Sequence, residues 1–218
     1  VIPMKLRNPA AIRIRGLRVA LYTDNGVVSP VPEIVAAVKE AAAALRNAGA
    51  QVTEARPEGL AEAAESAFAL MSGDGGATLI RVLERWGTDS ANSEVRASLE
   101  QLTPMATGEF TALLERVDRA REAMLPFFDR FDLIVSPVNV ELAVPHGTAP
   151  ARVYPGLSYT VPFNLSGWPA GVVRAGANGN GLPIGVQVIA APWREDLVLA
   201  ALTTLESALG GWKAPRIV

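Results

Sequence analysis

The segment between residues 158 and 189 constrains this chain more than any other part of the sequence. Its first part, residues 158–169, is dense in Gly, Pro, Asn and Thr, and strongly apolar stretches follow at 170–176 and 183–190. Turn-forming residues beside apolar runs predict a tight irregular turn that leads into two buried strands. The sequence between the strands, Asn178-Gly-Asn-Gly181, predicts a hairpin, because Asn and Gly both accept positive φ.

The start of the chain predicts a strand-helix-strand unit. An apolar run at 17–22 ends in the turn-rich Thr23-Asp-Asn-Gly26, and a segment rich in Ala, Glu, Lys and Leu follows at 33–48, with Gly49 just beyond it. This pattern is typical of a buried strand and then a helix with a glycine stop. Residues 51–55 give the second strand, and such a unit usually places its strands parallel and adjacent, with a right-handed crossover.

Helices and strands alternate over the rest of the chain. The near-continuous apolar run at 132–137, stopped by a proline, predicts a strand buried on both faces. The longest helical pattern, at 110–131, contains Pro126, which predicts a kink. Further helices are predicted at 61–70, 78–86, 94–102 and 195–209, a lead-in or linker at 1–16 and a long loop at 139–157. The alternation predicts the α/β class, with a mixed β-sheet flanked by helices.

Composition excludes several kinds of site. Lys and Arg number 20 against 22 Asp and Glu, a formal charge of −2, which removes the electrostatic argument for a nucleic-acid partner. The chain has no cysteine and a single histidine, His146, so neither a metal site nor a Ser-His-Asp relay is expected. No run of about 18 apolar residues is present, so no membrane span is predicted. We expect a cytoplasmic protein without a cofactor.

Two motifs resemble a known enzyme family. Tyr159-Thr-Val-Pro-Phe-Asn-Leu-Ser-Gly-Trp-Pro169 and Gly181-Leu-Pro-Ile-Gly-Val-Gln187 are similar to the C-terminal half of the amidase-signature hydrolases. Two more features agree in order and spacing: Gly16-Leu-Arg-Val-Ala with Ala48-Gly-Ala-Gln-Val52, and Asp132-Leu-Ile-Val-Ser-Pro137. The resemblance covers nearly the whole chain. It implies that residues 17–218 are the C-terminal region of an amidase-signature domain, an α/β/α sandwich.

The resemblance implies an amidase whose catalytic residues lie outside this chain. Enzymes of the family hydrolyse carboxamides with a Ser nucleophile, a second Ser held through a cis peptide and a Lys, all from their N-terminal half. This sequence has no Gly-Gly-Ser-Ser-Gly-type run, only Ser72-Gly-Asp-Gly-Gly76, and Lys39 falls in a predicted helix. No catalytic residue is therefore carried over. We expect the N-terminal catalytic half and a small amide as partners, and a fragment that is inactive alone.

Five residues are candidates for lining the substrate pocket: Leu157, Tyr159, Thr160, Asn164 and Trp168. Polar side chains in an irregular turn often satisfy loop backbone groups, so structural bracing is the alternative for Thr160 and Asn164, with Asn164 as the expected brace. A core aromatic is the alternative for Trp168. The glutamine-dependent branch of the family carries an Asp where this chain has Leu157, which argues against glutamine and favours a less polar acyl or amine group.

Two other functions stay open. A stand-alone, non-catalytic α/β module could bind a protein partner or a small molecule, and its apolar surface would then be covered by self-association as a homo-oligomer or by another chain. A small sugar- or nucleotide-binding domain rests on the strand-helix-strand unit alone, which is an argument from fold analogy.

Overall fold

A computed structural model describes residues 7–88, 99, 101–145, 148 and 153–214. Within these ranges the strands form one mixed sheet in the order β2-β1-β3-β5-β4, in which β1 is parallel to β2 and β3 while β5 is antiparallel to β3 and β4. The strands are β1 (Arg18–Leu21), β2 (Gln51–Glu54), β3 (Leu133–Pro137), β4 (Ala170–Ala177) and β5 (Pro183–Ala190). The predicted α/β class with a mixed sheet is confirmed.

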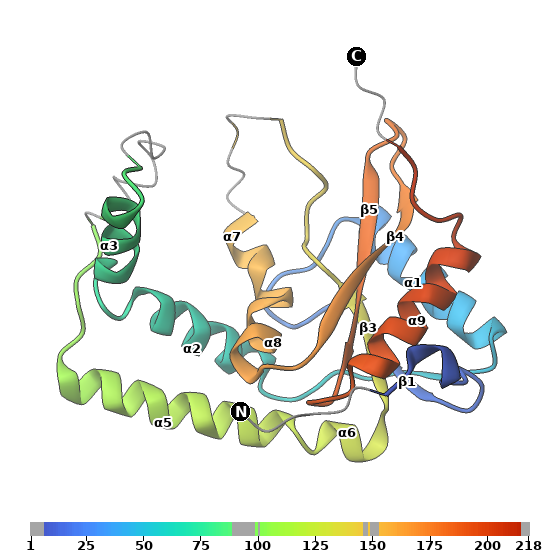
Figure 1. Ribbon diagram of the computed structural model, residues 1–218, viewed down its shortest axis with the longest axis horizontal. Helices are drawn as coiled ribbons and strands as arrows, with labels where there is room; N and C mark the ends of the chain where they lie inside the picture. The colour runs from blue at the N-terminus through green and yellow to red at the C-terminus, as the bar shows by residue number, and fades with distance from the viewer. Residues whose placement is uncertain (1–6, 89–98, 100, 146–147, 149–152, 215–218) are drawn as a thin grey trace.

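Helices cover both faces of the sheet (Figure 1). On one face lie α1 (Pro32–Asn47) and α9 (Glu195–Ala208). On the other lie α2 (Leu60–Ser72), α5 (Thr107–Met124) and α8 (Val161–Ser166). The shorter elements are η1 (Pro9–Ala11), α3 (Ala77–Arg85), α6 (Phe127–Arg130), α7 (Val153–Gly156) and η2 (Leu157–Tyr159). None of the helices in the described part of the chain is long and apolar enough to cross a membrane.

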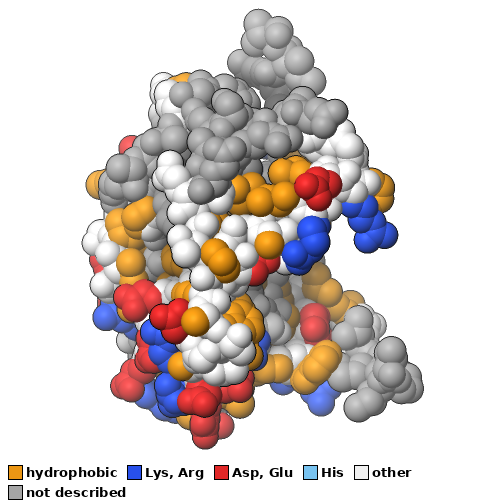
Figure 2. Space-filling view, turned by 90° about the vertical axis from the view of Figure 1, so that its left-hand side faces the viewer, with side chains coloured by type: hydrophobic (Ala, Val, Ile, Leu, Met, Phe, Trp, Pro, Cys, Tyr) orange, Lys and Arg blue, Asp and Glu red, His pale blue; other side chains and the backbone are white. Residues whose placement is uncertain are grey.

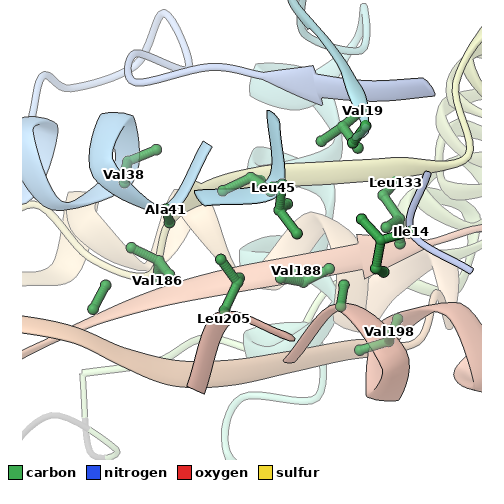
Figure 3. Close-up of a cluster of buried hydrophobic side chains, with 14 of the residues drawn as sticks. Ile14, Val19, Val38, Ala41, Leu45, Leu133, Val186, Val188, Val198 and Leu205 are labelled. Carbon is green, nitrogen blue, oxygen red and sulfur yellow. The ribbon is translucent and has the colours of Figure 1, made fainter. Parts of the chain in front are cut away.

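The core on the side of α1 and α9 is built from aliphatic side chains. Figure 3 shows side chains of both helices meeting those of the strands, with Val38 and Leu45 of α1 above Val186 and Val188 of β5. The strand residues Val19, Leu133 and Val135 belong to the same buried cluster. Since neighbouring side chains on a strand point to opposite faces, the intervening residues of these strands face the other layer.

The core on the side of α2, α5 and α8 contains aromatic and polar groups. Ala20 of β1, Ile134 of β3 and Ile189 of β5 supply its sheet side. Tyr22, Tyr159, Phe163 and Trp168 are buried among the helices, and Trp168 packs edge-on to Phe128 with their ring centroids 4.6 Å apart. This layer therefore differs in chemistry from the aliphatic one.

Most of the predicted elements are confirmed. The two strands of the first unit are parallel and adjacent, and β3 is buried along its whole length. The predicted hairpin joins β4 to β5, where Asn178 Oδ1 accepts hydrogen bonds from two backbone amides and Gly181 has φ +82°. The long helix is interrupted at Pro126, between α5 and α6, as its ring requires. The helix predicted at 94–102 lies mostly outside the described residues.

Two expectations for connecting segments were wrong. The predicted irregular turn at 158–169 is instead helical over η2 and α8, because Pro162 fits the first turn of a helix and Val161, Phe163 and Leu165 are buried. Gly167 ends α8 at φ +68°, a conformation open to glycine. The loop expected at 139–157 contains α7 at its end. In the lead-in, Ile14 is 8% exposed and belongs to the aliphatic core.

Candidate functional site

The carboxyl ends of β1 and β3 meet at one edge of the sheet. From β1 the chain leaves toward α1 on one face, and from β3 it leaves toward α7 and α8 on the other face (Figure 1). In open α/β sheets such a switch point is the usual place for a binding crevice. Here the edge is filled by a buried polar network that joins the loop after β1 to η2, and the network fixes how α8 sits on the sheet.

Tyr159 is the centre of this network. Its ring lies parallel to the ring of Tyr22, at 22° and with centroids 6.3 Å apart. Its hydroxyl accepts a hydrogen bond from the backbone N–H of Asn25 at 3.1 Å and donates to the carbonyl oxygen of Val28 at 2.8 Å. Both of these backbone groups belong to the loop after β1, so Tyr159 attaches that loop to η2.

Asn25 makes a second attachment between the same two segments. Its Nδ2 donates to Ser158 Oγ at 2.7 Å, while its Oδ1 accepts from the backbone N–H groups of Val27 and Val28 at 3.0 and 3.3 Å. The residue is only 3% exposed. Its amide therefore satisfies buried groups on both sides, as a buried polar side chain must.

Gln187 connects η2 to the sheet. From β5 its Nε2 lies 2.6 Å from the carbonyl oxygen of Tyr159, 2.7 Å from that of Pro137 and 3.1 Å from Ser136 Oγ. The side chain is almost completely buried, with 2% of the residue exposed. One amide group thus joins β3, β5 and the segment that begins α8.

Burial raises the pKa of both stacked tyrosines, but their hydroxyl groups differ in hydrogen bonding. Burial raises the pKa of Tyr159 to about 12, although the backbone N–H of Asn25 lowers it in part. Burial also raises the pKa of Tyr22, an effect that the nearby Ser136 only partly offsets. The Tyr22 hydroxyl forms no hydrogen bond of acceptable geometry within the described structure. Neither phenol is a base at neutral pH, so both act as neutral groups.

The helical form of η2 and α8 divides the five predicted pocket residues into two groups. Leu157, Thr160 and Asn164 are three and four positions apart, which places them on one side of a helical segment. Asn164 is exposed, and Leu157 and Thr160 are partly exposed, with Leu157 also packed against the core. We call these three residues the α8 outer face. Tyr159 and Trp168 point the other way, at 0% and 5% exposure.

The expectation that Asn164 braces the turn was wrong. Its side chain is exposed and makes no hydrogen bond to another described residue, because α8 turns it away from the core. Bracing is instead performed by Gln187 and Asn25, which sequence reasoning missed. For Gln187 the signal that could have identified it is a single amide within the apolar strand β5. Asn25 stands in the polar turn after β1, where its sequence context gives no such signal. Arg121 adds a further support, donating from Nε to the Leu165 carbonyl oxygen at 2.7 Å.

The buried serines of the site have no base beside them. Ser136 and Ser158 are 0% and 2% exposed, and their side-chain partners in the network are the amides of Gln187 and Asn25. An amide cannot take the proton of a nucleophilic hydroxyl. Lys39 is exposed on α1, on the opposite side of the sheet. Among the described residues no group of three or more His, Cys, Asp or Glu could hold a metal ion. The arrangement can therefore position and bind, but it holds no complete catalytic pair.

Comparison with known proteins identifies the family. The family model described as Amidase matches residues 1–199. The 6-aminohexanoate-cyclic-dimer hydrolase of Pseudomonas sp. (strain NK87) is 32% identical over 230 residues, which covers 92% of this chain and 45% of that protein. An acylamidase of Rhodococcus erythropolis is 29% identical over 211 residues, with 89% and 43% coverage. This chain spans about half the length of the curated relatives that it matches.

Solved structures give the same result. 6-Aminohexanoate cyclic dimer hydrolase complexed with substrate superposes with a TM-score of 0.74 at 27% identity, covering 98% of this chain and 50% of that chain. A fatty acid amide hydrolase superposes with a TM-score of 0.78, covering 96% and 42%, but at 21% identity this likeness supports the fold alone.

Proposed function

The chain belongs to the amidase family of amide hydrolases, and from this premise we propose that it is the C-terminal, non-catalytic portion of an amidase. In the intact protein a Ser, a second Ser in a cis peptide and a Lys outside these 218 residues would carry the chemistry. The nucleophilic Ser would attack the carbonyl carbon of a non-peptide carboxamide and expel the amine, and water would then hydrolyse the acyl-enzyme. Backbone N–H groups beside the nucleophile would stabilise the oxyanion.

The observation that carries this proposal is the state of the serines at the sheet edge. Ser136 and Ser158 are hydrogen-bonded to amides and buried, so neither has the neighbouring base that an activated hydroxyl needs. An amidase fold whose two buried serines at this edge have no neighbouring base is best explained as a support for a catalytic centre that another segment supplies.

The sheet offers an edge for that other segment. β4 is a terminal strand of eight residues, and Arg174 is its only charged residue. The opposite terminal strand, β2, has only four residues, of which Gln51 and Glu54 are polar and exposed. Charged and short edge strands resist further pairing, whereas long apolar ones favour it. We therefore place the catalytic half beside β4, extending the sheet.

Apolar side chains beside β4 support this placement. Val172 is 56% exposed, Leu199 of α9 is 49% exposed and Trp212 is 74% exposed. All three line a shallow groove between β4 and α9. Exposed apolar surface of this kind usually marks an interface, and a buried Trp often dominates the binding energy.

The substrate proposed is a small carboxamide with a weakly polar acyl or amine group. Leu157 on the α8 outer face is apolar, and the named activities of the relatives above are those of a cyclic-dimer hydrolase and an acylamidase. We further expect the intact protein to act in the cytoplasm.

The proposal is tested by assaying two proteins on a simple aryl anilide. The 218-residue chain alone should show no turnover above the buffer rate, whereas the natural protein read from the complete reading frame should hydrolyse the anilide. A Gly-Gly-Ser-Ser-Gly-like run upstream of Val1 would support the same result. Turnover by the 218-residue chain itself would contradict the proposal.

A stand-alone binding module is the alternative, and α3 favours it. This helix has no buried residue; Leu79 and Val82 on it are 43% and 45% exposed, and Trp86, which follows it, is 76% exposed. Figure 2, which looks at the molecule from the side of α3, shows hydrophobic side chains exposed on this face, with charged ones gathered toward its base. A natural reading frame of only these 218 residues, with a dimer in solution, would favour the module.

A further inference from the structure

The Gln187 side-chain nitrogen lies within hydrogen-bond distance of three oxygens of the buried network, two on β3 and one on η2. This nitrogen, Nε2, has two hydrogens and three oxygen acceptors within 3.1 Å, on Ser136, Pro137 and Tyr159. None of these acceptors can be reached by water, because the glutamine is 2% exposed and Ser136 and Tyr159 are 0% exposed. Loss of the donor would leave buried oxygens unpaired, which is far more costly than loss of an exposed hydrogen bond.

The shortest of these bonds acts on the peptide unit that begins α8. The carbonyl of Tyr159 and the N–H of Thr160 belong to one planar peptide group, so a bond that fixes the oxygen also fixes the direction in which Thr160 leaves. The Thr160 carbonyl then accepts from the backbone N–H groups of Phe163 and Asn164 at 3.1 and 3.2 Å. A continuous series of hydrogen bonds thus runs from β5 to Asn164.

We propose that Gln187 is a positioning residue that sets the orientation of the α8 outer face, the surface of Leu157, Thr160 and Asn164 that would meet the substrate. That this face meets a substrate rests on the proposed function, whereas its orientation by Gln187 does not. Gln187 touches no reacting atom. It acts through the Tyr159 carbonyl, 2.6 Å away, on the residues that follow.

Gln187→Glu is the sharpest substitution for testing this. It keeps the shape of the side chain but replaces the amide donor by an oxygen that faces three other oxygens. Burial among oxygens raises the pKa of the introduced carboxyl, and its protonated form regains one donor. The nearest titratable groups in the network, the phenols of Tyr22 and Tyr159, have raised pKa values and stay neutral between about pH 5 and pH 8. Any dependence on pH in that window therefore reports the new carboxyl.

Two further variants complete the design. Gln187→Met fills the same space without a charge or a donor, so it should disturb α8 equally at all pH values. Gln51→Glu makes the same chemical change on β2, where the residue is exposed, and serves as the matched control. All variants are made in the intact natural protein.

The experiment measures amide hydrogen exchange by mass spectrometry in the peptide covering residues 159–166, as a ratio to wild type at pH 5 and pH 8. We expect exchange to accelerate about tenfold or more in Gln187→Glu at pH 8, since the donor to the Tyr159 carbonyl is lost, and to return toward wild type at pH 5. Gln187→Met should show the acceleration at both pH values, and Gln51→Glu at neither. Unchanged exchange in 159–166 for both Gln187 variants, or acceleration spread over the whole protein, would overturn the proposal.

A kinetic measurement separates this inference from the proposed function. If the wild type hydrolyses anilides, Gln187→Glu at pH 8 should raise KM at least about threefold for a long-chain acyl anilide while changing KM for acetanilide little, and the difference should shrink at pH 5. Equal changes for both substrates would contradict a role in orienting the outer face. A wild type that hydrolyses no amide would remove the proposed function, and the exchange ratios would still decide whether Gln187 positions α8.

Discussion

The two layers that cover the sheet are built on different principles. The layer of α1 and α9 has an aliphatic core, formed by residues such as Leu45, Val188 and Leu205, and its buried carboxylate, Asp196, pairs locally with Arg194 at the start of α9. The layer of α2, α5 and α8 buries hydroxyls and amides, including Asn25, Ser158 and Gln187. Both layers pack against the same strands, so the difference lies in the kind of side chain that each layer buries.

An aliphatic core stabilises a fold but orients its parts only through shape. A hydrogen-bonded network adds direction, at the risk that any unpaired member is costly. The network on the second side holds the loop after β1 and the start of α8 in one arrangement. The second layer thus specifies the orientation of a surface in addition to burying apolar side chains, whereas the first acts through apolar packing.

Truncation of a buried side chain in the aliphatic layer should lower the stability more than the loss of one hydrogen-bonding group in the other layer. Leu45→Ala removes a fully buried side chain from α1, and we expect the free energy of unfolding to fall by about 2–5 kcal/mol. Urea denaturation of the intact protein measures it. The control Leu114→Ala, at a position 40% exposed on α5, should cost much less. Equal losses would show that burial of Leu45 in this layer does not determine the cost of the truncation.

The two stacked tyrosines test whether direction matters in the second layer. Tyr159→Phe removes a hydroxyl that pairs Asn25 N and Val28 O, and leaving these groups unpaired should cost about 1–3 kcal/mol of unfolding free energy. Tyr22→Phe removes an equally buried hydroxyl that is without a partner in the described structure, so stability should be unchanged or slightly higher. Thermal denaturation of the two variants gives the comparison. If Tyr22→Phe lowers the unfolding free energy as much as Tyr159→Phe, the cost of removing the hydroxyl depends on burial and not on hydrogen bonding.

The smallest effect is expected at the other end of the strands, where a surface ion pair joins β1 to the start of β3. Arg18 donates to both oxygens of Asp132, with two contacts at 2.8 Å and 3.2 Å from its side chain. Burial alone would raise the pKa of Asp132, but the hydrogen bonds from Arg18 outweigh it and lower the pKa. Since the pair is partly exposed, Asp132→Asn should cost at most about 1 kcal/mol at pH 7.

The pH dependence of this pair has a defined sign. Because the pKa of Asp132 is lowered in the folded state, its contribution is complete above the unfolded pKa of about 4 and is lost as the pH falls through the folded value. The stability difference between wild type and Asp132→Asn should therefore vanish under acidic conditions. A difference that grew on acidification would contradict the assignment.

Local sequence patterns were sufficient for the sheet and most helices, but not for the network. β3 and the hairpin of β4 and β5 could be predicted because apolar runs and Asn-Gly turns determine them within a few residues. The helical form of residues 157–166 could not, since Pro162 and the flanking Gly167 and Pro169 suggest a turn until burial of Phe163 and Leu165 is known. Gln187 and Asn25 meet their partners 28 and 133 residues away, which no local pattern reveals.

For the same reason the sequence could identify the five pocket candidates as a group but could not tell which are buried and which are exposed. Sequence places Leu157, Tyr159 and Thr160 side by side, and only the helical twist of η2 and α8 turns Tyr159 inward and leaves Thr160 at the surface. Their contact with a substrate stays a prediction.

The most direct test of the account is to find the nucleophile. The intact natural protein would be treated with a serine-reactive fluorophosphonate, with and without an excess of amide substrate, digested and mapped by mass spectrometry. We predict that the substrate-protected label lies on a serine outside these 218 residues, because the buried Ser136 and Ser158 have amides and not bases as side-chain partners in the network. A substrate-protected label on Ser136, Ser158 or any other serine of this chain would contradict it.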